Sequence, residues 1–276
     1  MNKNIEFFKA SASGNDFIII DRFRLRTAAS RAANNRLAKA LCRRKLSVGA
    51  DGLLLIEPSR ICDFKMRIFN PDGKEAEMCG NGSLCAALYA LKQKVCGRQM
   101  KIETRAGILE ARVSRELVKI KFSRPKDLRL NFDLSVGGRR QNLNYINTGV
   151  PHTVCFVKDL DKIRVAESGK QMRYHPEFQP TGANADFVQV ISRARIRLRT
   201  YERGVEEETL SCGTGAVAAA IITVYEMQNN PRGKFKVKVD TRSGQALNVY
   251  FEIAGEKIAQ VYLEGPAQII YRGRIE

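Results

Sequence analysis

The chain has 276 residues, 44% of them hydrophobic and 28% charged, and its 47 Lys and Arg against 29 Asp and Glu make the formal net charge +18. This is the composition of an ordinary globular protein, and the length suffices for one large domain or two of ordinary size. No apolar run is long enough for a transmembrane helix, and the polar residues 1–4 lack a signal-peptide pattern. We therefore expect no membrane contact and a cytoplasmic location.

The cysteine and histidine contents argue against a metal site. Seven cysteines is an odd number, and they show neither the CxxC spacing of a zinc ribbon nor a disulfide framework. The chain holds two histidines, His152 and His175, which are too few for a His-rich metal centre. A reducing compartment, in which thiols stay free, fits this content.

The net charge is the one bulk property that points to another class of protein, because a pI near 9.8 is typical of nucleic-acid binders. However, the basic residues are spread along the chain, without RNA-recognition aromatics or a zinc finger. Alternate basic residues over 193–199 indicate one solvated face of a strand. We expect nucleic acid to bind only adventitiously, through the net charge.

The first half of the chain predicts strands around an Ala-rich helix that begins near Cys79. Before that cysteine, alternation and turn residues predict a strand, turn and strand over 5–21, a helix over 28–42, a loop over 47–52, and strands over 53–56 and 64–69. The turn Asn70-Pro71-Asp72-Gly73 then leads to Cys79. After the helix we expect a hairpin over 100–110 and a strand over 118–122.

The second half repeats this order. Strands are predicted over 187–190 and 196–201, with a turn over 202–205 that leads to Cys212. The stretch Cys79-Gly80-Asn81-Gly82, with its apolar run, returns as Cys212-Gly213-Thr214-Gly215 with a similar run. Residues 101–107 and 238–244 also echo each other, at Cys-to-Thr intervals of 25 (79 to 104) and 29 (212 to 241). We infer a duplicated unit, each copy made of mostly antiparallel strands around a helix.

Each of the two cysteines is expected at a helix N-terminus, where unpaired N–H groups and the helix dipole lower a thiol's pKa and attract a carboxylate. Two such thiols suit the removal and return of a proton at a carbon beside a carboxylate, with a thiolate base on one face and a thiol acid on the other. That reaction inverts a stereocentre. A redox dithiol is one alternative, but a local CxxC is missing. Two unrelated buried cysteines are the other, against which the duplication argues.

The residues around both cysteines closely resemble diaminopimelate epimerases. The resemblance rests on residues 69–82, 201–204 and 208–215, and it covers essentially the whole chain. Four further motifs belong to it: Gly14-Asn15-Asp16-Phe17, Gly49-Ala50-Asp51-Gly52, Thr148-Gly149-Val150-Pro151-His152 and Asn184-Ala185-Asp186-Phe187. Each motif is weak alone, but together they are very specific.

The resemblance implies a cofactor-independent epimerase that interconverts LL- and meso-2,6-diaminopimelate in lysine and cell-wall synthesis, usually as a homodimer. It implies that Cys79 and Cys212 are the acid/base pair and that no metal is needed. Binding of the reacting α-carboxylate is assigned to Gly80, Asn81, Gly213 and Thr214. Binding of the distal amino-acid end is assigned to Asn15, Asn70, Asn184, Glu202 and Arg203. His152, together with Glu202, would lie near the thiols.

The fold implied is α/β (α+β), with two pseudo-symmetric domains, each a mostly antiparallel sheet wrapped around a central helix. We expect an N-terminal domain of residues 1–124 plus 266–276, which carries Cys79, and a C-terminal domain of residues 125–265, which carries Cys212. The strand-like tail 267–276 is expected to return to the first domain.

Each polar assignment has a structural alternative. The three Asn residues could satisfy backbone groups in turns, His152 could be a satisfied interior histidine, and Arg203 could be a surface charge. For Arg203, the position just before the second cysteine loop favours a carboxylate partner. The remaining cysteines are expected to be structural: Cys42, Cys62, Cys85, Cys96 and Cys155.

Two positions depart from the usual family pattern. Leu84 stands where an Arg is usual, and Val150 stands where an Asn usually precedes Pro-His. Neither touches the cysteine pair, so both bear on the substrate rather than on the reaction type. A racemase of another amino acid, such as proline or hydroxyproline, is therefore the nearest alternative. A basic nucleic-acid-binding protein that keeps the fold is the alternative from another class.

Overall fold

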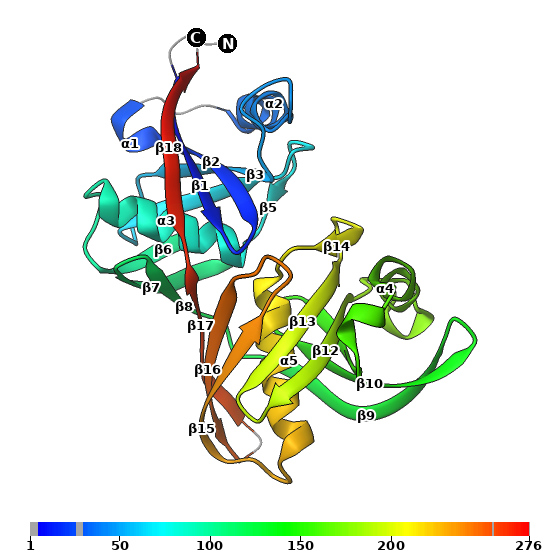
Figure 1. The fold of residues 1–276 in the computed structure, drawn as a ribbon. Helices are drawn as coiled ribbons and strands as arrows, with labels where there is room; N and C mark the ends of the chain where they lie inside the picture. Colours follow the sequence, from blue (N-terminus) through cyan, green and yellow to red (C-terminus); the bar gives the residue numbers. More distant parts are fainter. Residues whose placement is uncertain (1–4, 26–29, 256, 276) are drawn as a thin grey trace. The chain divides into compact units, whose positions relative to one another are not determined.

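The computed structural model describes residues 5–25, 30–255 and 257–275, and it divides into two compact units (Figure 1). Unit 1 comprises Met1–Ile120 and Gly265–Glu276, and unit 2 comprises Lys121–Glu264. The domain boundaries expected from the sequence lie within a few residues of these. Within the described ranges, no helix is both long and apolar enough to span a membrane.

In the part of unit 1 that the structure describes, strands alternate with three helices. In chain order its elements are β1 (Ile5–Ala12), β2 (Asn15–Asp21), α1 (Arg22–Leu25), α2 (Arg31–Leu41), β3 (Gly52–Glu57), β4 (Phe64–Phe69), β5 (Glu75–Ala76), α3 (Gly80–Lys92), β6 (Gln99–Thr104), β7 (Gly107–Ser114), β8 (Leu117–Lys121) and β18 (Gln268–Ile275). The helix predicted over 28–42 is α2, and residues 28 and 29 lie outside the described residues. The short helix α1 was not predicted.

Unit 2 follows the same plan. Its elements are β9 (Lys126–Val136), β10 (Arg139–Asn147), β11 (Pro151–Phe156), η1 (Leu160–Lys162), α4 (Val165–Arg173), η2 (Pro176–Phe178), β12 (Asn184–Ser192), β13 (Arg195–Glu202), β14 (Glu207–Thr209), α5 (Gly213–Met227), β15 (Gly233–Asp240), β16 (Ala246–Ala254) and β17 (Lys257–Pro266).

Strand pairing repeats between the units, element for element. In unit 1, β1 is antiparallel to both β18 and β2, β2 is parallel to β3, β3 is antiparallel to β4, and β4 is antiparallel to β5 and parallel to β6. Unit 2 has the same pairings in the same directions. The strands β1, β18, β2, β3, β4, β5 and β6 correspond, in that order, to β10, β9, β11, β12, β13, β14 and β15. Each unit has two further antiparallel pairings. In unit 1 these are β6 with β7 and β7 with β8, and in unit 2 they are β15 with β16 and β16 with β17. The duplication expected from the sequence is therefore a duplication of topology.

One apolar helix fills the centre of each unit. Helix α3 packs on β1, β2, β3, β4, β7 and β18, and α5 packs on β10, β11, β12, β13, β15 and β16 (Figure 1). Residues 80–90 of α3 are all buried, as are residues 215–224 of α5. Small side chains let the strands approach on every side, which is why the Ala-rich runs are placed here. The central helices thus have no solvent face over most of their length.

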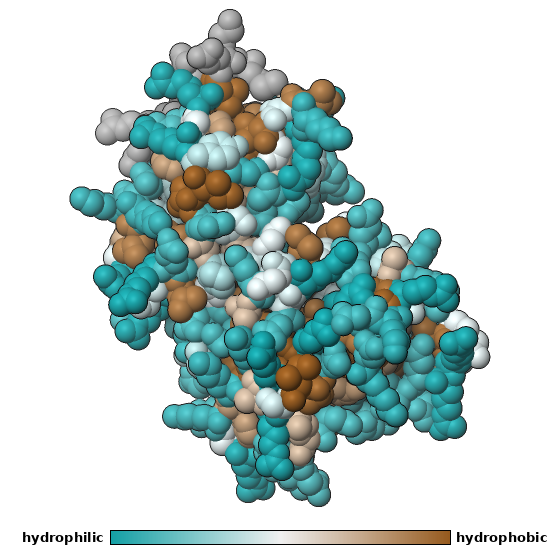
Figure 2. All heavy atoms as spheres, viewed as in Figure 1, coloured by the Kyte–Doolittle hydropathy of each residue, from teal (hydrophilic) through white to brown (hydrophobic). Residues whose placement is uncertain are grey.

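In addition to its central helix, each unit has a helix that covers the outside of its sheet: α2 in unit 1 and α4 in unit 2. Helix α2 buries Ala38 and Leu41 against Ile18, Ile20 and Leu53. In unit 2 the corresponding helix α4 buries Val165 and Met172 against β12 and β13. On the face shown in Figure 2, hydrophilic side chains cover most of the surface, and the hydrophobic ones form separate groups. Each unit therefore has apolar layers on both sides of its sheet.

The basic strand over 193–199 shows the predicted alternation, because Ile196 and Leu198 are buried while the alternate arginines are exposed or half-exposed, and ion pairs are added on the basic face. On β13 each alternate arginine is ion-paired: Arg195 with Asp240 at 2.6 Å, Arg197 with Asp161 at 2.7 Å, and Arg199 with Glu208 at 2.6 Å. The acidic partners come from β15, η1 and β14, which the linear sequence does not place beside this strand. Part of the net positive charge is therefore locally neutralised.

The C-terminal strand gives a first test of the architecture. A chain that ends at Pro266 lacks β18, which pairs with β1 from Ile5 to Ser11 and places Tyr271 edge-on against Phe7. We expect unit 1 to lose more than about 3 kcal/mol of unfolding free energy, since a row of backbone pairs and an apolar cover are removed. Urea unfolding measures this loss, and Tyr271→Ala, which keeps the strand, should cost only about 1 kcal/mol. A truncated chain as stable as the full one would contradict the assignment.

Candidate functional site

Each of the two predicted cysteines, with the first turn of the helix after it, forms one predicted half-site. The first half-site, around Cys79, lies between β5 and α3. Cys79 is the N-cap of α3: its backbone is extended (φ −141°, ψ 124°), and its sulfur accepts the Gly82 N–H at 3.5 Å. Its carbonyl accepts the first helical hydrogen bond, from Ser83 N at 2.9 Å. The N–H groups of a helix's first turn have no acceptor inside the helix. The predicted placement of this cysteine at a helix start is confirmed.

Asn15 and Asn81 are brought together by the fold, although 66 residues separate them. Asn81 Nδ2 donates to Asn15 Oδ1 at 2.5 Å, and Asn15 Nδ2 donates to Asp51 Oδ2 at 3.2 Å. Arg44 binds Asp51 at 2.7 Å and Asp16 at 2.6 Å. The first turn of α3 is thereby tied to the β1–β2 turn and to the loop before β3. Asn15 keeps one N–H and one lone pair for a ligand.

A second cation, the buried Lys9, contacts the same network from the interior of the unit. Lys9, which is 6% exposed on β1, pairs with Asp16 at 2.6 Å and donates to the carbonyl of Gly49. Burial by itself would raise the pKa of Asp16, but the hydrogen bonds from Arg44 and Lys9 lower it below its usual value. Asp16 therefore stays ionised and holds both loops in place.

Asn70 lies apart from this network. It begins the turn after β4, where its N–H binds the Lys74 carbonyl and its own carbonyl accepts the Gly73 N–H, both at 2.9 Å. Its side chain is exposed. The structure therefore shows a turn role for the Asn70 backbone and leaves the side chain at the surface.

The second predicted half-site lies at the start of α5. Cys212, which is 6% exposed, is the N-cap, and its carbonyl accepts the Ala216 N–H at 2.9 Å. Its sulfur lies 3.3 Å from Thr214 Oγ1, and the Thr214 carbonyl accepts a hydrogen bond from Thr148 Oγ1 at 3.0 Å. The predicted helix-start position is confirmed for this cysteine also.

The expected lowering of the thiol pKa is wrong for Cys212. Burial raises its pKa well above the ordinary value, and the carboxylates of Glu202 and Asp186 raise it further. Hydrogen bonds from Thr214 and the Gly215 N–H act in the opposite direction but do not prevail. The helix dipole is only one influence on this thiol, because tertiary packing removes water from the sulfur and places two negative charges near it. Cys212 is therefore a thiol in the free protein.

His152 belongs to a buried polar cluster beneath α5. The ring is fully buried, with Nδ1 at 2.7 Å from Asp186 Oδ2 and Nε2 at 3.4 Å from Asn184 Nδ2. Asp186 also accepts from Thr200 Oγ1 at 2.7 Å. One ring nitrogen thus faces a carboxylate and the other faces an amide nitrogen, so both have polar partners. His152 is a satisfied interior histidine here, which was the structural alternative.

Asn184 connects His152 to the turn that carries Arg203. Its Nδ2 donates to the Pro151 carbonyl at 3.0 Å and contacts His152, and its Oδ1 accepts the Arg203 N–H at 2.7 Å. Both amide hydrogens are thus engaged, and only one oxygen lone pair is left for a ligand. The Arg203 guanidinium donates to the Thr181 carbonyl at 3.2 Å. In this structure, Asn184 mainly ties the start of β11 to the β13–β14 connection.

Equivalent glycines allow the close packing of both helix starts. A Cβ on Gly82 would lie 3.3 Å from Ile68 Cδ1 and from Leu54 Cδ2. A Cβ on Gly215 would lie 2.6 Å from Asp186 Oδ1, closer than real Cβ atoms come. Contact rather than backbone angles therefore disfavours a side chain at the third position after each cysteine, strongly at Gly215 and less so at Gly82.

The five cysteines predicted as structural share one property, which is that the pKa of every thiol is raised. Burial raises the pKa of Cys42, Cys96 and Cys155 to about 11, and burial also raises the pKa of Cys62 and, far more, of Cys85. All seven cysteines are free thiols. Cys212 shares this raised pKa, so the structural role expected for these five cysteines stays a prediction.

Three residues with clear structural roles received no role at the sequence level. Asp51 orients Asn15, Asp186 orients His152, and Thr148 holds the Thr214 carbonyl. Each lies inside a motif that carried the family resemblance, which was the available signal. The departing residues have ordinary places: Leu84 is fully buried in α3, and Val150 is half-buried beside Pro151.

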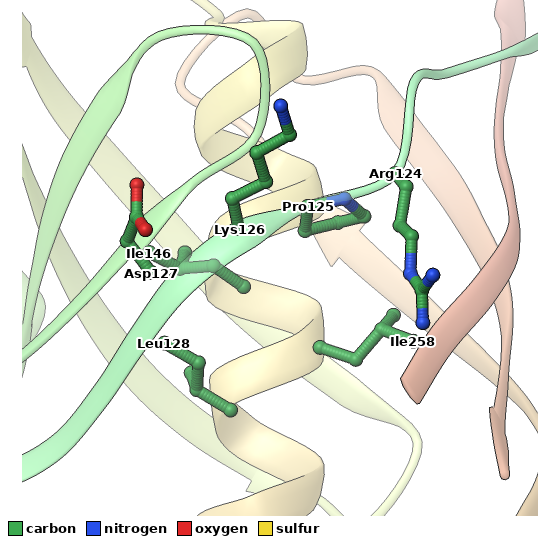
Figure 3. Close-up of a pocket in the computed structure, with 7 residues that line it drawn as sticks. All are labelled: Arg124, Pro125, Lys126, Asp127, Leu128, Ile146 and Ile258. Atoms are coloured by element: carbon green, nitrogen blue, oxygen red, sulfur yellow. The ribbon is translucent and has the colours of Figure 1, made fainter. Parts of the chain in front are cut away.

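Two other features of the described residues do not compete with these half-sites. A pocket in unit 2 is lined by residues 124–128 with Ile146 and Ile258, and it contains none of the predicted site residues (Figure 3). Among the residues described, no group of three or more His, Cys, Asp or Glu side chains could hold a metal ion. The two helix starts therefore remain the candidate site.

Comparison with known proteins gives one family. The sequence model described as diaminopimelate epimerase matches residues 7–125 and 144–270. The diaminopimelate epimerase of Aquifex aeolicus is 39% identical over 286 residues, covering 98% of each chain. That of Methanocella arvoryzae is 39% identical over 286 residues, covering 99% of this chain and 97% of the relative. That of Chlorobaculum tepidum is 36% identical over 268 residues, covering 96% and 99%.

Solved structures show the same fold at lower identity. A PhzF-family phenazine biosynthesis protein of Bacillus anthracis matches with a TM-score of 0.76 and 19% identity over 99% of both chains. A probable proline racemase of Agrobacterium radiobacter matches with a TM-score of 0.72 and 16% identity, covering 99% of this chain and 93% of the other. At these identities the likeness establishes the mixed α/β fold, in which β-sheet predominates.

The raised pKa of Cys212 predicts how the thiol reacts with pH. Because only the thiolate is alkylated, iodoacetamide should label Cys212 at a rate that keeps rising past pH 9. The rate at each cysteine is read by mass spectrometry, and the same cysteine in urea-unfolded protein is the reference. A rate that levels off below about pH 8 would show that the helix dipole outweighs burial.

The contact at Gly215 predicts a second effect. Gly215→Ala should destabilise unit 2 by about 1–3 kcal/mol, because the added methyl group meets the Asp186 carboxylate, although Ala favours a helix by about 1 kcal/mol. Gly97→Ala is the control, since nothing lies within 4 Å of its Cβ position. Thermal unfolding compares the two, and equal stability of both variants would contradict the predicted clash.

Proposed function

The chain belongs to the diaminopimelate epimerase family of enzymes, and on that premise we propose that it interconverts LL- and meso-2,6-diaminopimelate by moving one α-proton between Cys79 and Cys212 without a cofactor. The reaction serves lysine and peptidoglycan precursor synthesis. The observation that carries the proposal is the duplicated N-cap: one cysteine opens the buried central helix of each unit.

The proposed step conserves protons and electrons. One cysteine, as thiolate, takes the α-proton, and the C–H electron pair moves into the adjacent carboxylate. The other cysteine, as thiol, then donates its proton to the opposite face of the same carbon, and the electron pair returns to form the new C–H bond. The configuration is inverted, and the two cysteines have exchanged protonation states. In the reverse direction their roles are exchanged.

The raised pKa of Cys212 suits the donor role in one direction. A buried thiol that keeps its proton in the free protein is ready to deliver it once negative charge develops on the substrate. Glu202 and Asp186 contribute to this protonation. We propose that Glu202 has a second role, as a partner for the substrate's distal ammonium group.

The first-turn N–H groups supply the stabilisation that the step needs. We propose that Gly80 and Asn81 in α3, and Gly213 and Thr214 in α5, bind the reacting carboxylate as charge accumulates on it. Helix N-termini bind anions through unpaired N–H groups and the helix dipole. Donors already held in place cost no reorganisation during the reaction. The ties from Asn15 to Asn81 and from Thr148 to Thr214 keep both first turns in position.

We propose that the distal amino-acid end is held by Asn15, Asn70, Asn184, Glu202 and Arg203. The hydrogen-bond inventory refines two of these roles. Asn184 can offer only an oxygen lone pair, which suits an ammonium group, while Asn15 can offer either an N–H or a lone pair. Arg203 suits the distal carboxylate. His152, whose ring nitrogens are both engaged, would act by holding Asn184 and Asp186 in place rather than by touching the substrate.

The proposal predicts proton exchange that depends on both cysteines. Reduced protein with LL-diaminopimelate in D2O should lose the α-proton NMR signal and form the meso isomer. Cys79→Ser and Cys212→Ser should each slow this by at least about 100-fold, since a hydroxyl is a far weaker base than a thiolate. Cys62→Ser, a cysteine of unit 1 without an assigned role, is the matched control and should keep full activity.

The rival functions give different outcomes in the same experiment. Exchange with proline or another amino acid, but not with diaminopimelate, would indicate a racemase of that amino acid. Silence on every substrate, with salt-dependent nucleic-acid binding that survives both Ser variants, would indicate a nucleic-acid-binding protein. The homodimer and the cytoplasmic location expected from the sequence stay predictions, which sedimentation and cell fractionation test.

A further inference from the structure

A glutamate stands four residues before each of the two cysteines, and each is held by an arginine through two hydrogen bonds. Arg67 donates to Glu75 from Nε at 2.7 Å and from Nη2 at 2.9 Å. Arg199 donates to Glu208 from Nε at 2.6 Å and from Nη2 at 2.9 Å. The two-pronged geometry fixes direction as well as distance, unlike a single ion pair.

The two pairs occupy equivalent places in the duplicated topology. Glu75 on β5 lies opposite Phe69 of β4, and Arg67 is two residues before Phe69. Glu208 on β14 lies opposite Tyr201 of β13, and Arg199 is two residues before Tyr201. Each arginine therefore reaches its glutamate diagonally across the same strand pair, and we call each pair an Arg–Glu clamp.

Burial separates these clamps from ordinary surface ion pairs. The side chains of Glu75 and Glu208 are 5% and 11% exposed, and those of Arg67 and Arg199 are 17% and 20% exposed. The hydrogen bonds from Arg67 lower the pKa of Glu75, so the carboxylate stays ionised. Loss of either arginine would take away the two hydrogen bonds that orient a largely buried carboxylate.

A second arginine from the duplicated hairpin binds each glutamate. Arg105, which follows Thr104, donates to the Glu75 backbone carbonyl at 3.3 Å. Arg242, which follows Thr241, approaches Glu208 Oε2 to 3.1 Å. The sequence similarity between residues 101–107 and 238–244 therefore has a structural counterpart: in both copies an arginine contacts the segment before the cysteine.

The segment between clamp and helix is short. Three residues separate Glu75 from Cys79, and three separate Glu208 from Cys212. On the far side the cysteine carbonyls accept the first hydrogen bonds of α3 and α5, whose interiors are enclosed by strands. Each cysteine backbone is therefore held on both sides, by the clamp before it and by the helix after it.

We propose that Glu75 and Glu208 are positioning residues, one for each thiol, which through their Arg–Glu clamps fix the backbone that sets Cys79 and Cys212 at their helix starts. The inference rests on the proposed function in taking these two thiols as the reacting groups. The glutamates touch neither substrate nor sulfur in this role. They hold each sulfur within the narrow range of positions that proton transfer needs.

The kinetic test uses Glu75→Gln and Glu208→Gln, which keep the side-chain shape and remove the charge. Each should lower kcat about 10- to 100-fold, since a small misplacement of a reacting group has effects of that size. KM should change less than about threefold, because the distal contacts are left intact. The control variants Asp133→Asn and Glu6→Gln remove exposed pairs, with Arg140 in unit 2 and Arg272 in unit 1, and should keep full kcat. Unchanged kcat in either clamp variant overturns the proposal.

A substrate-free measurement shows whether the effect is local. Site-resolved iodoacetamide labelling of folded, reduced protein should be at least about fivefold faster at Cys79 in Glu75→Gln, with Cys212 changed less than about twofold. Glu208→Gln should show the reverse. A general loss of stability would expose both thiols together, so equal changes at both cysteines, or none at either, overturn the proposal.

A conservative change completes the test. Arg67→Lys and Arg199→Lys keep the charge but lose the two-pronged geometry, and should reproduce most of the effect of the matching Gln variant. Each Lys–Gln double variant should lose no more activity than its worse single variant, as residues of one unit do. Full activity of both Lys variants would show that charge alone suffices and would overturn the clamp. If the unaltered protein epimerises nothing, the proposed function fails, while the labelling result still decides whether each clamp positions its thiol.

Discussion

The structure depends on the hydrogen bond by which each cysteine opens a buried helix. The Cys79 carbonyl accepts from Ser83 N, and the Cys212 carbonyl accepts from Ala216 N, both at 2.9 Å. Strands enclose α3 and α5, so neither helix can shift without disturbing its whole unit. A side chain at the N-cap of such a helix inherits that rigidity. Packing of the hydrophobic core therefore fixes the positions of both cysteines.

The electrostatics of Cys212 result from two opposing influences of the same fold. The helix start offers N–H groups that favour a thiolate, whereas burial and the nearby carboxylates of Glu202 and Asp186 favour the thiol, and the latter prevail. The same packing that fixes the sulfur therefore keeps its proton in place. In the reaction proposed above, a proton donor and an anion-binding helix start would not be in conflict, because the helix N–H groups would act on the charge that develops on the carboxylate.

The two units share one backbone topology but carry different polar side chains around the start of the central helix. In unit 1 the first turn of α3 is tied by Asn81 to Asn15, and Asp51 and Arg44 stand behind them. In unit 2 the space under α5 is filled by the His152, Asp186 and Thr200 cluster. What the units keep in common is the backbone path into the helix: a glutamate held by an arginine, three residues, a cysteine and a glycine packed tightly at the third helical position. The shared features are those that place the thiol, and the divergent ones surround it.

Much of this protein could be read from local sequence. The Ala-rich runs after two glycine-containing loops determined two buried helices with a cysteine at each start, because helix propensity and N-cap position are local properties. The repeat of those runs determined the duplication, and the motifs around them determined the family. Contacts between distant residues were decided only by the tertiary structure. Asp51 behind Asn15, Asp186 behind His152, and the acidic partners of Arg195, Arg197 and Arg199 lie on elements that pairing brings together. The protonation of Cys212 was decided in the same way, since a pKa depends on the water and charges around a group, and those are set by packing rather than by its neighbours in sequence.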